Sequence, residues 1–390
     1  MTIFNSLGSS YDLNFVLKTL FAKRNESAKP VLKSYLQKKY NGKAILAYKG
    51  REAITLALEI LNLPKESDIA INGFTCYTVY KAIANAGYQP ICLDLENNLD
   101  LNFSANQLLQ ALRKNPRIKV VIVQNTLGYP CDIEKIENIC RENDIILIED
   151  LAHCVGTKYK NGEEAGTIGD FVVLSFSQDK IIDAVSGGAL IIRNKKYQNP
   201  SLASQGLTLQ NKQQMIDRIY PLLTFVIRNT YQIGIGKLIH FILKSLNLLS
   251  KPMNESFYTK YSLPDWYQYL ALSAFGGLNK NLRHRQKIAS IYAASLDKKI
   301  VSQFINKNIN LSANLRYPIF VENRKILINY LKKEGIYVSD IWYDSVDNNL
   351  KNTKEAADKI LNLPTHINVS EKDAKNISLK INQFFRRNEL

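Results

Sequence analysis

The chain has 390 residues, of which 46% are hydrophobic and 22% are charged, a composition typical of a globular protein with a large buried core. Five cysteines without a Cys-x-x-Cys pair argue against a disulfide scaffold, and only four histidines argue against a metal centre. The net charge of +16 favours anionic partners, although solvated surface lysines also explain it. The first residues do not resemble a signal peptide, and no apolar run reaches the roughly 18 residues that span a membrane, so we expect a cytoplasmic protein.

The order of the predicted elements indicates three parts. Apolar and basic residues alternate at helical spacing near the start, so we expect an N-terminal helical arm over 1–39. A large domain is expected over 40–285, because short aliphatic runs separated by helical segments predict a mostly parallel, doubly wound α/β sheet. A smaller C-terminal α/β domain is expected over 286–390. The predicted strands of the large domain are Ala44–Ala47, Asp68–Ile71, Pro90–Asp94, Lys119–Val123, Ile145–Ile148, Phe171–Phe176 and Ala189–Ile192.

A helical insertion interrupts the large domain at about 204–260. It contains two amphipathic segments and carries seven Lys or Arg against two Asp or Glu. One interpretation is a helical hairpin packed on the body of the protein or on a partner subunit. The other is a peripheral contact of residues 215–250 with the inner face of a membrane, in which both apolar faces insert and three basic side chains meet lipid head groups. Those three side chains are Arg228, Lys237 and Lys244.

An acid, a hydroxyl and a lysine follow two neighbouring predicted strands. The run Ile145–Ile148 leads into Asp150, and the run Phe171–Phe176 contains Ser175 and leads into Lys180. Because the carboxyl ends of parallel strands share one edge of a sheet, these groups are expected to meet. The trio suits pyridoxal phosphate (PLP), which is held as a lysine Schiff base with an acid on its ring nitrogen, while a hydroxyl and backbone N–H groups bind its phosphate. Taken singly, each residue has a structural interpretation as a helix cap or a solvated loop residue.

The order and spacing of the motifs around this trio carry a family resemblance. The motif residues are Asp150, Ala152-His153, Gly166, Gly169-Asp170, Ser175-Phe176, Lys180 and Gly187-Gly188. This pattern resembles the PLP-dependent sugar aminotransferases of the DegT/StrS group, which have a fold-type-I architecture. The resemblance implies that Lys180 and Asp150 are catalytic and contact PLP, and that His153 and Ser175 also bind the cofactor. A lysine rather than a histidine at position 180 favours transamination over dehydration in this group.

Three further segments are similar to cofactor-binding turns of the family. Gly50 matches a glycine at a strand-to-helix turn that binds the phosphate, and Arg51 replaces the hydroxyl that follows it, so Arg51 either contacts the phosphate or faces solvent. Cys76 replaces the aromatic residue that stacks on the cofactor ring, and Tyr77 follows it. Either Tyr77 has taken over the stacking or the ring lies against a smaller side chain. The Asn-x-Arg segment that holds the partner subunit's cofactor phosphate is replaced by Leu-Pro-Asp-Trp at 263–266.

The resemblance therefore predicts an aminotransferase that moves an amino group from an amino acid, such as glutamate, to a keto sugar. We expect a nucleotide-linked sugar of cell-surface polysaccharide biosynthesis and a homodimer with its active sites between the subunits. One alternative is a catalytically idle relative that acts as an interaction or membrane-surface protein. Another is a nucleic-acid binder, but no finger, homeodomain or aromatic-basic RNA motif supports it, so we expect no nucleic-acid partner.

Overall fold

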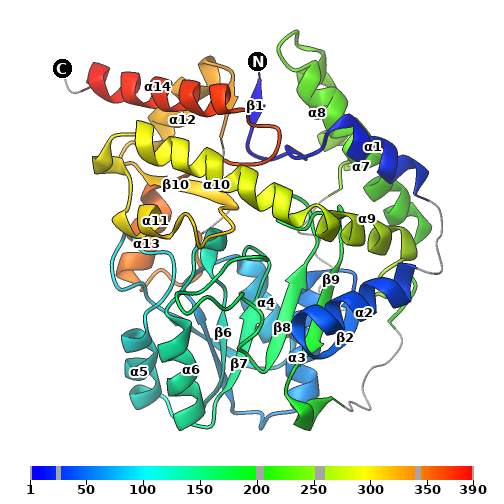
Figure 1. Cartoon of the computed structure of the whole chain (residues 1–390), viewed down its shortest axis with the longest axis vertical. Helices are drawn as coiled ribbons and strands as arrows, with labels where there is room; N and C mark the ends of the chain where they lie inside the picture. Colours follow the sequence, from blue (N-terminus) through cyan, green and yellow to red (C-terminus); the bar gives the residue numbers. More distant parts are fainter. Residues whose placement is uncertain (1, 23–27, 199–205, 251–259, 339–343, 389–390) are drawn as a thin grey trace.

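The computed structural model describes residues 2–22, 28–198, 206–250, 260–338 and 344–388. Its centre is a seven-stranded sheet with the order β2-β9-β8-β7-β6-β3-β5 (Figure 1). The five strands from β5 to β8 run parallel, whereas β9 is antiparallel to both of its neighbours. The mostly parallel sheet predicted for the large domain is confirmed. Its strands are β2 (Lys43–Ala47), β3 (Asp68–Asn72), β5 (Gln89–Leu93), β6 (Ile118–Val123), β7 (Ile146–Asp150), β8 (Phe171–Ser175) and β9 (Gly188–Ile192).

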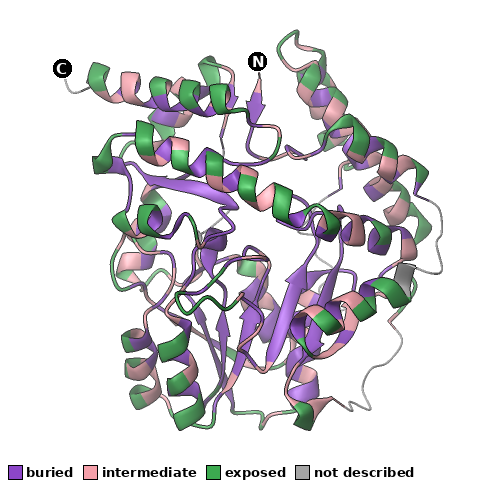
Figure 2. Ribbon diagram, in the orientation of Figure 1, coloured by how far each residue is buried: buried purple, intermediate pink, exposed green. Residues whose placement is uncertain are grey.

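Helices cover both faces of this sheet. Along β6, Val120 and Ile122 pack against α3 and α4, while Val121 and Val123 face the opposite side, where α2, α5, α6 and α9 lie. Both faces are therefore dry, which explains why the central strands read as continuous aliphatic runs rather than as alternating ones. In Figure 2 the sheet is buried and the outer sides of these helices are exposed. The helices are α2 (Ala28–Tyr40), α3 (Gly50–Leu61), α4 (Tyr77–Asn85), α5 (Ala105–Lys114), α6 (Ile133–Glu142) and α9 (Asp265–Gly276).

The C-terminal part has a separate hydrophobic core around an antiparallel pair of strands, β10 and β13. The long helix α10 crosses from the large domain to this part and packs against α14 (Figure 1). The short strand β12 pairs with β4 of the large domain. The elements are α10 (Leu278–Ser295), α11 (Gln303–Asn308), β10 (Arg316–Phe320), α12 (Arg324–Lys333), β11 (Ile336–Tyr337), β12 (Asp344–Ser345), α13 (Lys351–Lys359), β13 (Ile360–Pro364) and α14 (Glu371–Asn388), with β4 at Phe74–Thr75.

The first residues of the chain join the C-terminal part instead of starting a helix. Strand β1 (Ile3–Phe4) pairs in parallel with β11, and the Asn5 side-chain amide donates to the carbonyl oxygen of Asn362 at 2.6 Å. The first helix, α1, begins only at Leu13 and ends at Phe21. The predicted helical arm therefore begins later than position 1. Residues 3 and 4 are instead paired with β11 as a strand.

The described part of the insertion, residues 206–250, forms two helices, α7 (Asn211–Asn229) and α8 (Ile235–Ser245). Helix α7 packs on α1 and buries Tyr220 and Ile227, so its apolar face is not available to a membrane. The guanidinium of Arg228 donates to the carbonyl oxygens of Ser9 and Tyr11 at 3.1 and 2.7 Å. The predictions that the α7 face inserts and that Arg228 meets lipid head groups are therefore wrong, because both are used to hold the N-terminal segment.

One buried carboxylate ties the insertion to the large domain. Asp217 of α7 accepts hydrogen bonds from the hydroxyl groups of Tyr48 and Tyr267 at 2.6 and 2.7 Å. Tyr48 lies in the turn between β2 and α3, and Tyr267 lies in α9. A buried acceptor with several donors is rigid, since breaking any of these bonds leaves an unpaired polar group. Helix α7 is thus anchored beside the turn that opens α3.

Candidate active site

Three segments of chain converge at the beginning of β9. In the sheet, Gly188 pairs with Ser175 of β8 on one side and with Ala47 of β2 on the other. A Cβ on Gly188 would lie 2.6 Å from the carbonyl oxygen of Leu174 and 2.8 Å from the backbone nitrogen of Gly50. Only glycine fits at this point, and its absence of a side chain lets the N-terminus of α3 approach the end of β8.

The N-terminus of α3 and Ser175 form a cradle for an anion. A Cβ on Gly50 would lie 2.8 Å from Cβ and 3.2 Å from Oγ of Ser175, so the space beside the hydroxyl exists only because residue 50 is glycine. Backbone N–H groups of the first helical turn have no partner within the helix, and the helix dipole favours negative charge there. Lys49, at the N-cap, is buried, and burial lowers the pKa of its ammonium group to about 8.

Lys180 and His153 form the polar contact at the centre of the site. Lys180 Nζ lies 2.9 Å from His153 Nε2, and His153 Nδ1 accepts the backbone N–H of Leu127 at 3.4 Å. Because Nδ1 is an acceptor, this bond assigns the imidazole proton to Nε2, which then donates to an uncharged lysine nitrogen. Burial, followed by the charge of Lys180, lowers the pKa of His153, and burial lowers that of Lys180. Both groups are therefore stabilised in their neutral forms.

The backbone that holds His153 is itself in an uncommon conformation. Leu127 has φ +56°, in the left-handed region that only a few per cent of non-glycine residues adopt. It lies in the short 3₁₀ turn η1 (Thr126–Gly128), which begins three residues after the end of β6. The surrounding hydrogen bonds maintain this conformation, including the one from the Thr126 N–H to the Asn102 side chain at 2.8 Å. The strained turn aims an N–H group at the histidine.

Asp150 ends β7 at the same edge of the sheet, as predicted, and its carboxylate is buried. Burial raises its pKa to about 6, although the N–H of Ala152 at 2.9 Å and the charge of Lys180 act in the opposite direction. A buried carboxylate with so few donors is better stabilised by a cation that arrives later. The protonated ring nitrogen of PLP, which the sequence predicts beside Asp150, would be such a cation.

Arg51 and Tyr77, the two other predicted cofactor contacts, differ in their burial and in the side chains that they meet. Arg51 is half-buried, and its charge interacts with Glu52 and with the Cys76 thiol. Tyr77 is 52% exposed, and its ring stacks on that of Tyr80 at 5.8 Å. The reason is local: Cys76 is the N-cap of α4, so Tyr77 is the first helical residue and meets the side chain three positions later on the helix surface. Within this chain, Cys76 rather than Tyr77 lies toward the site.

Arg316 is a contributor to the site that was missed in the sequence, whereas Cys76 was considered there as the smaller side chain beside the cofactor ring. The Cys76 thiol interacts electrostatically with Lys180, and so does the guanidinium of Arg316. Arg316 is buried in β10, and its guanidinium lies 3.9 Å from the carboxylate of Asp179. The signal for Arg316 was present, because a basic residue inside an otherwise apolar and aromatic strand requires a buried partner. The signal for Cys76 was its place at the position of the family's stacking aromatic residue.

Residues 263–266 pack inside their own subunit. Leu263 lies 3.2 Å from the position that a Cβ on Gly187 would occupy, and Trp266 donates to the Gln214 side chain of α7 at 3.2 Å. The segment therefore joins the insertion to the cofactor edge of the sheet. Among the residues that the structure describes, no cluster of three or more His, Cys, Asp or Glu could hold a metal ion.

The fold is that of PLP-dependent aminotransferases. PseC of Helicobacter pylori, an aminotransferase involved in the biosynthesis of pseudoaminic acid, superposes with a TM-score of 0.76 over 99% of this chain and 100% of its own, at 16% identity. The model of the DegT/DnrJ/EryC1/StrS aminotransferase family matches residues 23–382, so the chain belongs to this family. The family resemblance predicted from the motifs is confirmed.

Two curated relatives illustrate the extent of the similarity. GDP-perosamine synthase of Escherichia coli O157:H7 is 29% identical over 157 residues, which are 40% of this chain and 42% of that protein. The dTDP-4-amino-4,6-dideoxy-D-glucose transaminase of Shigella dysenteriae is 23% identical over 324 residues, which are 77% of each chain. The first match thus spans less than half of the relative's length.

The aminotransferases of this family depend on PLP, and the residues of the site fit that cofactor. The cradle that Gly50 and Gly188 keep open beside Ser175 would hold its phosphate. Lys180 would bind it covalently, and Asp150 would pair with its ring nitrogen. The fit rests on spaces that a single methyl group would fill.

Gly50→Ala is expected to weaken PLP binding about 5- to 150-fold, because the new methyl group overlaps Ser175 and overpacking costs about 1–3 kcal/mol. The matched control is Gly276→Ala, where nothing lies within 4 Å of the added Cβ. Titration of both apoproteins with PLP, followed by absorbance, measures the effect. Equal affinities in the two variants would show that the phosphate binds elsewhere.

Asp150→Asn keeps the size of the side chain but removes its charge. We expect PLP to remain bound while kcat falls about 10- to 100-fold, since a hydrogen bond to a charged group contributes about 1.5–3 kcal/mol. KM should change much less, because the lost interaction acts on the reacting state. Steady-state kinetics of the purified variant check this, and a kcat near that of the unmodified protein would mean that another acid faces the ring nitrogen.

Proposed function

We propose that this chain is a PLP-dependent aminotransferase that transfers an amino group from an amino acid such as glutamate to a nucleotide-linked keto sugar, in cell-surface polysaccharide biosynthesis. The observation that carries the proposal is the 2.9 Å contact between Lys180 Nζ and His153 Nε2 in a buried site that also contains Asp150. The names of the two relatives, a GDP-sugar synthase and a dTDP-sugar transaminase, support a nucleotide-linked sugar.

Each residue of the site has a role that follows from its surroundings. When bound, PLP supplies an electron-accepting ring that stabilises negative charge at the carbon next to the amino group. Burial lowers the pKa of Lys180, which favours the neutral amine that can take a proton from that carbon and return it. His153 orients the lysine through Nε2, and Ser175 with the first turn of α3 binds the phosphate.

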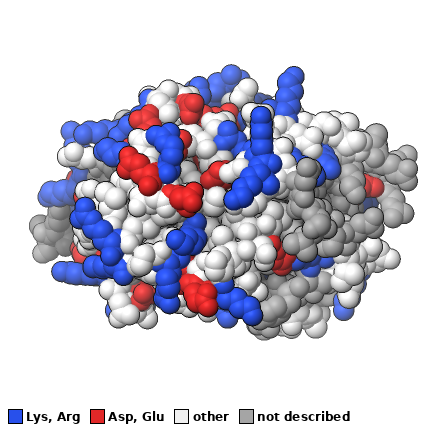
Figure 3. Space-filling model, turned by 90° about the horizontal axis from the view of Figure 1, so that it is seen from below, with Lys and Arg blue, Asp and Glu red and all other residues white. Residues whose placement is uncertain are grey.

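The charge distribution on one face of the molecule gives no support to a nucleic-acid partner. On the face shown in Figure 3, lysine and arginine side chains are interspersed with acidic and uncharged ones. A nucleic-acid site needs a continuous basic stripe that tracks the phosphate backbone. The high net charge is thus distributed over solvated side chains on this face.

The exposed face of α8 supports a further part of the proposal, a peripheral contact of the cytoplasmic enzyme with the inner face of the membrane. The only residue of α8 that is buried is Gly236, while Leu238 and Phe241 are 60% and 70% exposed. Ile235 and Ile242 extend this apolar face, and Lys237 lies beside it. An amphipathic helix of this kind lies in the plane of an anionic lipid surface. In the described parts of the chain, no helix has the length and apolarity needed to cross a membrane.

The family resemblance also implies a homodimer, and we include it in the proposal. Leu13, Leu17 and Phe21 form an exposed apolar stripe on α1, spaced four residues apart. Contiguous apolar surface on a helix is usually covered in the assembled protein. This stripe is separate in sequence from the α8 face, so each surface has its own partner in the proposal.

Lys180→Ala should lower amino transfer to a keto sugar at least about 10³-fold and remove the visible absorption band of the lysine-bound cofactor, because no other amine replaces Nζ. The control is Lys195→Ala, an exposed lysine in the 3₁₀ turn η2 (Lys195–Tyr197). Thermal unfolding of both variants tests that the fold is intact. Turnover with a retained absorption band in Lys180→Ala would refute the assignment.

The α8 contact is tested by flotation of the enzyme with anionic and neutral vesicles at low and high salt. We expect binding to anionic vesicles that weakens with salt and falls at least tenfold in the double variant Leu238→Ser, Phe241→Ser, since each buried side chain contributes about 1.5–3 kcal/mol. The control is Ile326→Ser with Leu379→Ser, which removes equally exposed apolar groups from α12 and α14.

Sedimentation of the same two double variants shows whether the α8 face contacts lipid or a second copy of the chain. A dimer that persists in both variants supports a lipid contact for α8. Dissociation of the dimer only in the α8 variant, without flotation of the unmodified enzyme, would assign this face to a second copy of the chain.

A further inference from the structure

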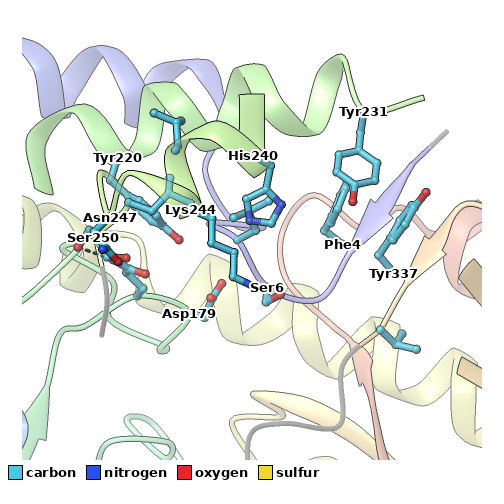
Figure 4. A pocket seen from close by; sticks show the side chains of 15 residues that line it. Phe4, Ser6, Asp179, Tyr220, Tyr231, His240, Lys244, Asn247, Ser250 and Tyr337 are labelled. Atoms are coloured by element: carbon cyan, nitrogen blue, oxygen red, sulfur yellow. Dashed lines mark hydrogen bonds between the residues drawn. The ribbon is translucent and has the colours of Figure 1, made fainter. Parts of the chain in front are cut away.

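A cavity of about 460 Å³ lies between α8, the segment that follows β1, strand β11 and the loop that follows β8 (Figure 4). Its volume is within the range of about 300–1,000 Å³ that small-molecule sites occupy. The loop residues that line it, Gln178 and Asp179, immediately precede Lys180. A ligand in this cavity therefore lies beside the loop that carries the lysine of the active site.

One wall of the cavity consists of three aromatic rings. Phe4 and Tyr337 stack with their ring centroids 4.8 Å apart, and Tyr231 meets them edge-on at 5.1 and 4.9 Å. The rings come from β1, the connection between α7 and α8, and β11. Together they make a broad apolar surface of the kind on which a nucleobase packs.

The wall opposite the loop carries positive charge and hydrogen-bond donors. His240 and Lys244 are one turn apart on α8 and point into the cavity (Figure 4). Helix α8 has no acidic residue. Among the described residues that line the cavity, Asp179 is the acidic one, and its carboxylate already accepts the Ser9 hydroxyl at 3.3 Å and lies 3.9 Å from the Arg316 guanidinium. The α8 wall is therefore free to attract an anion.

We propose that this cavity binds the diphosphate carrier of the sugar substrate, with Lys244 and His240 on the phosphates and the aromatic wall on the nucleoside. The inference rests on the proposed function, because a nucleotide-linked sugar must be held by its carrier while the sugar reaches Lys180. A lysine ammonium binds phosphate as a point charge, and an imidazole N–H adds a directed hydrogen bond. The insertion thereby provides substrate recognition that the fold without α8 would lack.

The test is calorimetric titration of the PLP-loaded enzyme with GDP, dTDP and geranyl diphosphate. We expect at least one nucleoside diphosphate to bind, with a Kd that rises tenfold or more in Lys244→Ala and in His240→Ala. Lys212→Ala, which removes an exposed lysine of α7 that is not among the residues that line the cavity, is the control and should bind as the unmodified enzyme does. The absorption of the bound cofactor and its reaction with glutamate should be the same in all variants.

The outcomes separate this inference from the proposed function. Equal affinity of Lys244→Ala and the unmodified enzyme, or no binding of any diphosphate, would overturn the site even if amino transfer to a sugar occurs. Binding that depends on Lys244 without any amino transfer would support the site and refute the aminotransferase. Binding of geranyl diphosphate alone, again dependent on Lys244, would support a diphosphate site but overturn the nucleoside assignment in favour of a lipid carrier.

Discussion

The close packing of three backbone segments at Gly188 is the constraint on which the rest of the site depends. Strand β9 can lie between Ser175 and Ala47 only because no Cβ separates Gly188 from the carbonyl oxygen of Leu174 and the nitrogen of Gly50. This packing brings a hydroxyl group and the positive end of a helix to one point. A larger residue would separate α3 from the sheet and remove the anion cradle, because backbone atoms cannot move aside as a side chain can.

Removal of water from the adjacent polar groups gives the site its chemistry. Lys180 and His153 are displaced toward their neutral forms and Asp150 toward its protonated form, in each case chiefly by burial. These shifts oppose the charged states that would be most stable in water, and each pKa unit corresponds to about 1.4 kcal/mol. The large dry core around the sheet offsets this cost, and a bound cation at Asp150 reverses part of it.

The insertion shows how two helices with similar patterns acquire different roles. Helix α7 buries its apolar residues on α1 and holds Tyr48 and Tyr267 through Asp217, so it supports the turn that opens α3. Helix α8 packs on α7 but leaves Phe241 and its neighbours exposed on one side, while His240 lines a cavity on another. An amphipathic pattern requires that one face be covered but does not specify what covers it.

The sequence alone determined the α/β class, the parallel sheet and the family. Uninterrupted aliphatic runs can be buried only in a sheet covered on both faces, and the spacing from Asp150 to Gly188 places ligand-binding groups at one sheet edge. Only the tertiary structure decided that Arg228 is internal and that residues 3–4 pair with β11. The physical reason is the distance along the chain over which the deciding contacts act. Strands and motifs follow from neighbouring residues, whereas burial of a charge depends on contacts between segments more than 200 residues apart, as for Arg228 and Ser9.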